Sequence, residues 1–181
     1  VSTGMCELKT WSFVDEKSSN FFKFFGKSIK IDNPISSELS CMRKSLLINL
    51  LSAFKKNFNR GYSDISIFEI GPVFDGSSPG EQTELISGLR SGECGKKDWL
   101  QKKRSVDLYD IKVDILNVLG VCNFDENNII IDNLEIPQHF HPRKSGRVKI
   151  GSVLIGFFGV LHPNLLNQFD IASDLVGFEL N

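Results

Sequence analysis

Hydrophobic residues recur at helical spacing in the stretch that begins near residue 40. From Met42 onward the apolar positions advance by 4, 1, 3, 1, 3 and 4 residues, which traces one face of an α-helix. They are Leu46, Leu47, Leu50, Leu51, Phe54 and Phe58. Ser40 stands at the position of an N-cap and Gly61 at that of a C-cap, so the pattern predicts a helix over this range.

A second amphipathic helix is predicted over Asp107–Leu119. Its apolar positions again share one side of a helix: Leu108, Ile111, Ile115, Leu116 and Leu119. Two short helices are also predicted. One covers Asp15–Phe25, capped by Asp15 and ended by Gly26, and the other covers Pro163–Phe169 after the turn at His162.

Alternating or continuous apolar runs predict strands between these helices. Glu7–Val14 alternates, and Ile65–Phe74 and Glu84–Ser91 are placed to form a hairpin. Gly71 followed by Pro72 indicates a bulge or a sheet edge within the first strand of that hairpin. The remaining strand-like runs are Ile129–Ile131, Arg147–Ile150, Val153–Phe158 and Leu175–Leu180. We therefore predict an α+β fold, a mainly antiparallel sheet flanked by helices, in one domain over residues 1–181.

Composition narrows the class of protein. Apolar residues make up 41% of the 181 residues and charged residues 24%, which is typical of a globular domain with a real core. The 21 Lys and Arg and 22 Asp and Glu residues give a formal net charge of -1. A protein that works mainly by coating nucleic acid is usually strongly basic, so the balance argues against that class.

Cysteine usage and the chain start favour a cytoplasmic protein. Cys6, Cys41, Cys94 and Cys122 form no CxxC pair, so we expect reduced thiols and no zinc ribbon. The apolar run Val153–Leu161 is far shorter than the ~20 residues of a membrane span. No secretory signal is visible, and the absence of an initial Met suggests a piece of a longer polypeptide.

Motifs that would carry catalysis or metal binding are weak. His139 and His141 share one side of an extended segment and are a possible metal pair, but two structural histidines are the simpler interpretation. No Gly-x-Ser-x-Gly and no Walker loop occurs. The glycines from Gly151 to Gly159 are interpreted as close backbone approaches or bulges. We assign no catalytic, cofactor-binding or metal-binding residue.

Basic side chains offer candidate anion contacts. A segment rich in Lys and Arg with Trp99 among them has the form of an RNA backbone contact, although a solvated loop explains it too. Its members are Lys96, Lys97, Lys102, Lys103 and Arg104. Arg43, Lys44, Arg60 and the pair Arg143-Lys144 could each bind an anion, with surface solvation or helix-end pairing as the alternative.

Seven stretches, in order along almost the whole chain, carry a family resemblance. They are Glu7–Val14; Asn33-Pro34-Ile35 leading to Met42–Leu47 and Asn57–Arg60; Ile67–Phe74; Val106–Lys112; His141–Gly146; Gly156–Pro163; and Phe178–Leu180. Together they resemble the beta chain of bacterial phenylalanyl-tRNA synthetase, in its region with the class II synthetase core fold.

The resemblance implies a non-catalytic core domain that supports assembly with a catalytic alpha subunit. The family's enzyme is an (αβ)2 heterotetramer that charges tRNA(Phe) with phenylalanine, using ATP and magnesium; no cofactor is expected in this piece. One departure stands out, because Arg143 occupies the place of a glycine that the family usually shows, which puts any role of that glycine in doubt.

Residue types support the absence of catalysis. Activating a carboxylate with ATP requires fixed cations near the α-phosphate. The strand pair Ile65–Leu89 has no Arg before Arg90, and Gly156–Leu166 has no Arg or Lys. We therefore predict no ATP-dependent activation by this domain alone.

The alpha subunit is expected to contact the Ser40–Arg60 helix and adjoining strands. The candidate interface residues are Met42, Arg43, Leu46, Leu47, Leu50, Asn57 and Arg60. If this surface is apolar and free, the isolated domain should aggregate or self-associate through it. Two other functions stay open: an RNA-contacting module using Lys96–Arg104, and a free-standing amino-acid-activating enzyme.

Overall fold

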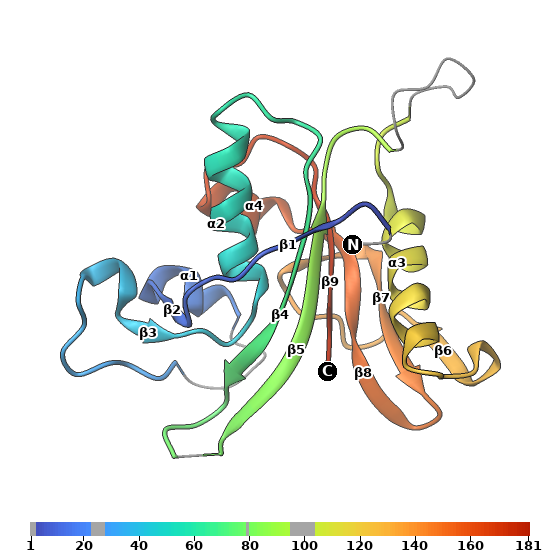
Figure 1. The fold of residues 1–181 in the computed structure, drawn as a ribbon, viewed down its shortest axis with the longest axis horizontal. Helices are drawn as coiled ribbons and strands as arrows, with labels where there is room; N and C mark the ends of the chain where they lie inside the picture. The colour runs from blue at the N-terminus through green and yellow to red at the C-terminus, as the bar shows by residue number, and fades with distance from the viewer. Residues whose placement is uncertain (1–2, 23–27, 79, 95–103) are drawn as a thin grey trace.

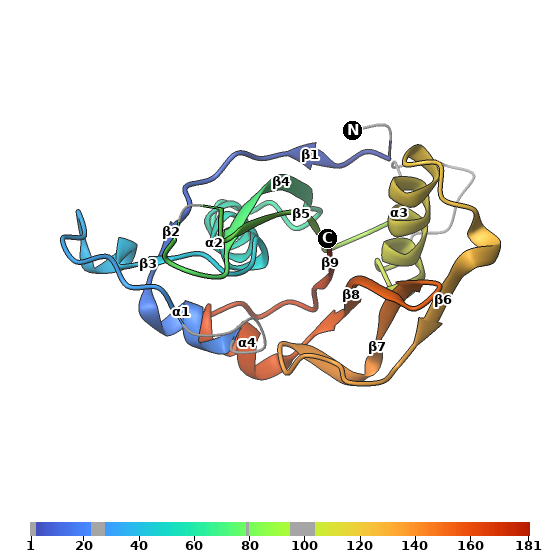
Figure 2. The ribbon, with the colours of Figure 1, turned by 90° about the horizontal axis from the view of Figure 1, so that it is seen from below.

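The fold centres on one large sheet, seen edge-on between its helices in Figure 2. The structure is a computed structural model that describes residues 3–22, 28–78, 80–94 and 104–181. Within these residues seven strands form the large sheet in the order β1-β4-β5-β9-β8-β7-β6 (Figure 1). In that order their bounds are Cys6–Glu7, Ser66–Phe74, Gln82–Arg90, Val176–Leu180, Val153–Leu161, Phe140–Ile150 and Ile129–Asp132. Only the contact of β1 with β4 is parallel among the described pairs, so the predicted α+β fold with a mainly antiparallel sheet is confirmed.

Helices cover both faces of this sheet. On one face lie α2 (Leu47–Phe58), α1 (Glu16–Phe21) and α4 (Pro163–Gln168). Buried side chains of α2 and α4 share a core cluster with Leu89 and Phe157, and the partly buried Phe21 of α1 packs against it. On the other face lies α3 (Leu108–Val121), which packs on Val148 and Phe178. The sheet therefore separates α1, α2 and α4 from α3, as Figure 2 shows.

The predicted strand Glu7–Val14 is wrong as one element. The chain leaves β1 after Glu7 and forms β2 (Phe13–Val14) in a small second sheet with β3 (Cys41–Met42). Between the two sheets, side chains make the contacts that a ladder would have made. Lys9 Nζ donates to the Ile70 carbonyl at 2.7 Å, and Thr10 Oγ1 donates to Glu69 Oε2 at 2.6 Å.

The long helix begins later than its sequence pattern predicts. Ser40 is not its N-cap, because the next residues pair with β2 and the helix starts at Leu47. Two side chains bind the first N–H groups instead: Ser45 Oγ accepts from the Leu47 N–H at 3.2 Å, and Glu179 Oε1, from a distant strand, accepts from the Leu46 N–H at 2.8 Å. The helix also ends early, at Phe58, and Gly61 adopts a φ of 91° in the following turn. The bond to Glu179 spans 133 residues and leaves no local sequence signal, whereas Ser45 is a local cap residue that the pattern beginning at Ser40 passed over.

Other predicted elements agree with the structure. Asp15 caps α1 by accepting from the Ser18 N–H, and Asp107 begins α3 with a capping box. Strand β1 faces only Ile67 and Phe68 of β4, so Pro72 lies at a free edge and interrupts no ladder. A Cβ on Gly156 would lie 2.1 Å from the Glu179 carbonyl, and the register of β7 and β8 shifts beside it, as close approach and a bulge require.

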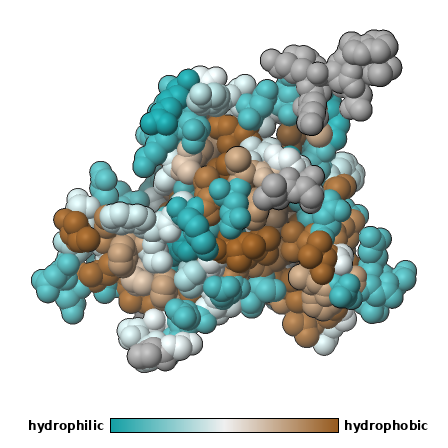
Figure 3. Space-filling model, viewed as in Figure 1, coloured by the Kyte–Doolittle hydropathy of each residue, from teal (hydrophilic) through white to brown (hydrophobic). Residues whose placement is uncertain are grey.

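Apolar side chains also remain on the surface. On the face shown in Figure 3 they gather over the middle of the sheet and over α3. A groove of about 410 Å³ there is lined by Met5, Phe68, Ile70, Val118 and Val121, among others. Exposed apolar area of this kind is typical of domains that work inside larger assemblies. No helix in the described part of the chain has the length and apolar character that crossing a membrane demands.

The packing of α2 leads to a first prediction. Leu50 is 0% exposed within the core that α2 shares with the sheet. Leu50→Ala should lower the free energy of unfolding by about 2–5 kcal/mol, because it leaves a cavity under the helix. Urea unfolding followed by circular dichroism measures the change. Lys56→Ala, on the exposed side of the same helix, is the control and should cost well under about 1 kcal/mol.

Candidate functional site

A buried ion pair lies where residues 43–46 cross the face of the sheet. The Arg43 and Glu69 side chains are 2% and 1% exposed, and Arg43 Nη1 lies 2.8 Å from Glu69 Oε1. Arg43 also donates to the Pro72 carbonyl and to Thr10 Oγ1, at 2.9 and 3.0 Å. Each group thus has several partners inside the protein. Buried charges of this kind persist only when their hydrogen-bonding capacity is met.

Gly71 provides the space that Arg43 occupies. A Cβ at this position would lie 2.6 Å from Arg43 Nη2. The guanidinium therefore lies flat against the backbone of β4, next to its partner carboxylate. Glycine at this position is explained by close approach, since its φ is not positive.

A second buried carboxylate, Glu179, lies on the central strand β9. Ser45 Oγ lies 2.9 Å from each of its oxygens, and the Leu46 N–H donates to it. Burial raises the pKa of Glu179 to about 7, and the bonds from Leu46 and Ser45 oppose that rise only in part. Residues 43–46 are thus tied to β4 through Glu69 and to β9 through Glu179.

Three arginines, which lie on both faces of the sheet, are not free to bind a nucleotide. Arg43 is held by Glu69, Arg90 donates to both oxygens of Asp114, and Arg147 binds Asp132 and Glu135. A guanidinium that is already neutralised by a carboxylate cannot serve a phosphate without breaking its own pair. The hollow beside Glu179 has a volume of about 170 Å³. Small-molecule pockets usually have at least ~300 Å³.

A wider groove of about 1310 Å³ lies outside the sheet, between α1, residues 34–40 and α2. Its charged lining comprises Asp15, Glu16, Glu38, Lys17 and Lys56. Glu16 is bound by Lys30 at 2.7 Å, and Asp15 is the cap of α1. This mixture of charges does not form the fixed cation pair that a triphosphate requires.

His139 and His141 make packing and hydrogen-bond contacts within the domain. His139 is fully buried between the rings of Phe22 and Phe140, and burial lowers its pKa to about 3. His141 Nδ1 accepts from the Arg143 N–H at 3.2 Å, which places the ring proton of the neutral form on Nε2 and leaves no lone pair there for a metal. No cluster of three or more metal-binding side chains occurs within the described residues. Arg143 itself has no positive φ, so its backbone does not need a glycine.

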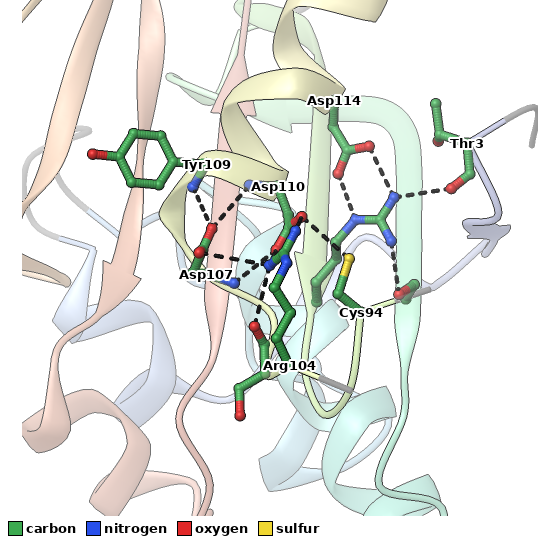
Figure 4. A network of polar contacts seen from close by, with 10 residues as sticks. Thr3, Cys94, Arg104, Asp107, Tyr109, Asp110 and Asp114 are labelled. Atoms are coloured by element: carbon green, nitrogen blue, oxygen red, sulfur yellow. Dashed lines mark hydrogen bonds and ion pairs between the residues drawn. The ribbon is translucent and has the colours of Figure 1, made fainter. Parts of the chain in front are cut away.

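The basic segment falls mostly outside the described residues, which include only Arg104 of its five candidates. Figure 4 shows the Arg104 guanidinium against Asp110, with Nη1 2.7 Å from Asp110 Oδ2, and Asp107 lies 3.5 Å away. The bond to Asp110 raises the pKa of Arg104, and the same bond lowers the pKa of Asp110 to about 2. Arg104 is therefore committed to α3, whereas Lys96, Lys97, Lys102 and Lys103 stay predictions.

Burial divides the candidate interface residues into two groups. Arg43, Leu46, Leu47 and Leu50 are between 0% and 2% exposed within this chain. A partner cannot contact these side chains while the domain stays folded. Met42, Asn57 and Arg60 reach the surface and stay predictions as interface residues.

The sequence of this chain matches a known family. Residues 1–181 match the family model described as the phenylalanyl tRNA synthetase beta chain CLM domain. The chain belongs to this family. It is 38% identical over 177 residues to the phenylalanine–tRNA ligase beta subunit of Paramagnetospirillum magneticum, and 37% identical over 185 residues to that of Bartonella quintana. The alignments cover 98% and 99% of this chain but only 22% and 23% of those relatives, so the chain spans less than a quarter of their length.

Solved structures show the same fold at low identity. Pyrrolysyl-tRNA synthetase from Desulfitobacterium hafniense superposes with a TM-score of 0.68 at 14% identity, over 99% of this chain and 61% of that one. At this identity the likeness concerns the fold alone. It agrees with the class II synthetase core that the sequence motifs imply.

The sequence alone pointed to Arg43 as a candidate residue but not to its partner Glu69 or to Glu179. Both carboxylates have a signal in the sequence: each is a lone acidic residue inside an apolar strand, between Phe68 and Ile70 and between Phe178 and Leu180. A buried strand rarely carries an unpaired charge. Such a residue therefore predicts a buried cation or a cluster of donors nearby, although it does not say which one.

The buried pair leads to a second prediction. Arg43→Met should lower the free energy of unfolding by about 3–5 kcal/mol, because it leaves Glu69 buried without its cation. Adding Glu69→Met should recover much of that loss in a double-mutant cycle measured by chemical denaturation. The exposed pair Lys55–Asp170 is the control, and Lys55→Met should cost at most about 1 kcal/mol. Strict additivity of the two core changes would contradict the coupling.

Glu179 leads to a third prediction, on pH. Its folded pKa of about 7 exceeds its ordinary value of 4.5, so between these values the folded state keeps a proton that the unfolded state releases. Stability should therefore fall as the pH rises from about 4.5 to about 7, by about 3 kcal/mol at most. Urea unfolding across this range measures the slope. Glu179→Gln should flatten it, whereas Glu84→Gln, exposed on β5, should leave it unchanged; an unaltered slope in the first variant contradicts the assignment.

Proposed function

We propose that this chain is the non-catalytic core domain of a phenylalanine–tRNA ligase beta subunit. It supports assembly with the catalytic alpha subunit, which then charges tRNA(Phe) with phenylalanine at the expense of ATP, with magnesium. The observation that carries the proposal is the pairing of Arg43, Arg90 and Arg147 with carboxylates in a chain of this family. A domain that holds the synthetase fold but commits its cations to internal pairs is suited to structural work.

Contact with the alpha subunit is proposed at the exposed end of α2. Arg60 follows the helix and is exposed, and Asn57 in its last turn is partly accessible. Met42, on β3 before the start of the helix, is partly accessible too and is proposed as a separate contact. Asn57 Nδ2 donates to the Ala53 carbonyl at 2.9 Å, so its side chain is held in place before any partner binds. A held polar side chain at an interface loses less entropy on binding. The proposed assembly is the (αβ)2 heterotetramer in the cytoplasm.

Two other functions find less support. A free-standing amino-acid-activating enzyme would need cations free to bind phosphate, and Arg43, Arg90 and Arg147 are all engaged. An RNA-contacting module would have to work without Arg104, since Asp107 and Asp110 hold that side chain. Any contact with tRNA is therefore proposed to run through the assembled enzyme.

Assembly with the alpha subunit is the fourth prediction. Co-expression with the alpha subunit of a relative should give a complex, and phenylalanine-dependent ATP–pyrophosphate exchange should require that subunit and be absent from this chain alone. Arg60→Glu should weaken the complex about tenfold, or about 1.4 kcal/mol, as measured by calorimetric titration. Lys112→Glu, on α3 at the opposite face of the sheet, is the matched charge reversal and should leave the affinity unchanged. Exchange activity in the isolated chain would overturn the proposed function.

A further inference from the structure

A wide bulge in β7 carries basic residues out of the regular ladder. In the register of β7 with β8, residues 141–144 lie opposite the single residue Val160. The Ser145 hydroxyl donates to the His141 carbonyl at 2.6 Å and so closes the bulge. Bulges give side chains new directions and often lie next to functional sites. The residues of this bulge include no acid: His141, Pro142, Arg143 and Lys144.

The histidine of the bulge is paired with a second histidine at the end of β8. His141 and His162 each precede a proline, and their rings stack with centroids 6.5 Å apart. Like Nδ1 of His141, which accepts from the Arg143 N–H, Nδ1 of His162 accepts a backbone bond, from the Asn164 N–H at 3.1 Å. Each neutral ring therefore has its proton on Nε2. Both side chains are partly exposed, so the pair offers two N–H donors side by side.

The two cations of the bulge are free of internal partners. Arg143 and Lys144 are exposed, and neither side chain has an ion pair or a hydrogen bond in the described part of the chain. Arg90 and Arg147, by contrast, are each bound by a carboxylate. A cation without an internal partner breaks no bond when it meets an anion. Two such cations next to two N–H donors form a cluster suited to negatively charged oxygens.

The position of the cluster favours an extended anion that passes over the surface. The three grooves described above include neither histidine and neither cation of the cluster. An enclosed nucleotide therefore does not fit, whereas a nucleic-acid backbone, which has one phosphate per nucleotide, can lie across an exposed bulge. The choice of RNA phosphates over the carboxylates of an acidic peptide rests on the proposed function, in which the assembled enzyme charges tRNA.

We propose that the bulge at residues 141–144, together with His162, binds backbone phosphates of tRNA. Arg143 and Lys144 supply the charge, and Nε2 of His141 and of His162 donate hydrogen bonds to the phosphate oxygens. The formal net charge of -1 gives the chain no general attraction for RNA, so this contact is local and weak. It adds to the contacts that the assembled enzyme makes, and it uses none of the residues proposed to meet the alpha subunit.

Binding of labelled tRNA(Phe) to this chain is the fifth prediction, measured by fluorescence anisotropy between about 50 and 200 mM salt. Arg143→Ala with Lys144→Ala should weaken binding about tenfold or more at the lowest salt, and should lower the salt slope by about two, because two phosphate contacts are lost. Lys17→Ala with Lys56→Ala is the matched control, since both lysines are exposed elsewhere on the surface. A wild-type chain that does not bind, or an equal loss in both pairs, overturns the proposal.

The histidine donors are tested separately. His162→Asn keeps a side-chain acceptor for the Asn164 N–H but removes the ring Nε2–H. Affinity for tRNA should fall about threefold while the urea midpoint stays the same, since a loss of this size is that of one hydrogen bond. Unchanged affinity contradicts the role of the histidine pair.

Three further outcomes decide between the alternatives. Lys102→Ala with Lys103→Ala should leave most of the binding, and loss of all binding in that pair assigns the contact to the other basic segment and overturns the proposal. Poly-glutamate that competes as well as unlabelled tRNA overturns the choice of phosphate. Calorimetric titration with the alpha subunit, without RNA, reports on assembly alone. A complex that forms while tRNA affinity ignores Arg143 and Lys144 overturns the phosphate site and leaves the proposed function standing.

Discussion

The fold depends on how two carboxylates inside the sheet are satisfied. Glu69 on β4 and Glu179 on β9 both point to the face that residues 43–46 cover. Without Arg43, Glu69 would keep only its bonds from Thr10, and without Ser45 and the start of α2, Glu179 would lose its hydrogen-bond donors. The position of the long helix and the burial of these two acids therefore depend on each other.

This dependence explains where sequence reasoning succeeded. Strands β4 and β5 and helix α3 are set by local patterns and local caps, such as the capping box of Asp107, and they lie close to their predicted bounds. The start of α2 was misplaced because Ser45 and the distant Glu179, not Ser40, bind its first N–H groups. Ser40 has the right residue type and spacing, yet the backbone just after it pairs with β2, and a carboxylate from the far end of the chain binds the helix start.

The candidate site shows the same division. Arg43 could be found from its motif, but the motif gives no sign of whether an arginine faces a partner, a phosphate or the protein interior. Burial decides the matter, and burial follows from packing across the whole chain. The pair with Glu69 and the space over Gly71 hold Arg43 inside the domain, where it contributes to packing and does not face the solvent. Two features together leave no arginine for a nucleotide's phosphates on this part of the sheet: no arginine occurs between Ile65 and Leu89, and Arg43, Arg90 and Arg147 pair with carboxylates.

Residues 93 and 105 form a backbone bridge at the base of the basic segment, and the Cys94 N–H donates to the Arg104 carbonyl at 2.8 Å. Residues 93–94 and 104–105 are thereby fastened to each other, and Arg104 fastens them to α3. A change in chain length between two positions that already meet adds little loop-closure entropy. Insertions or deletions between residues 94 and 104 would consequently leave β5 and α3 in place.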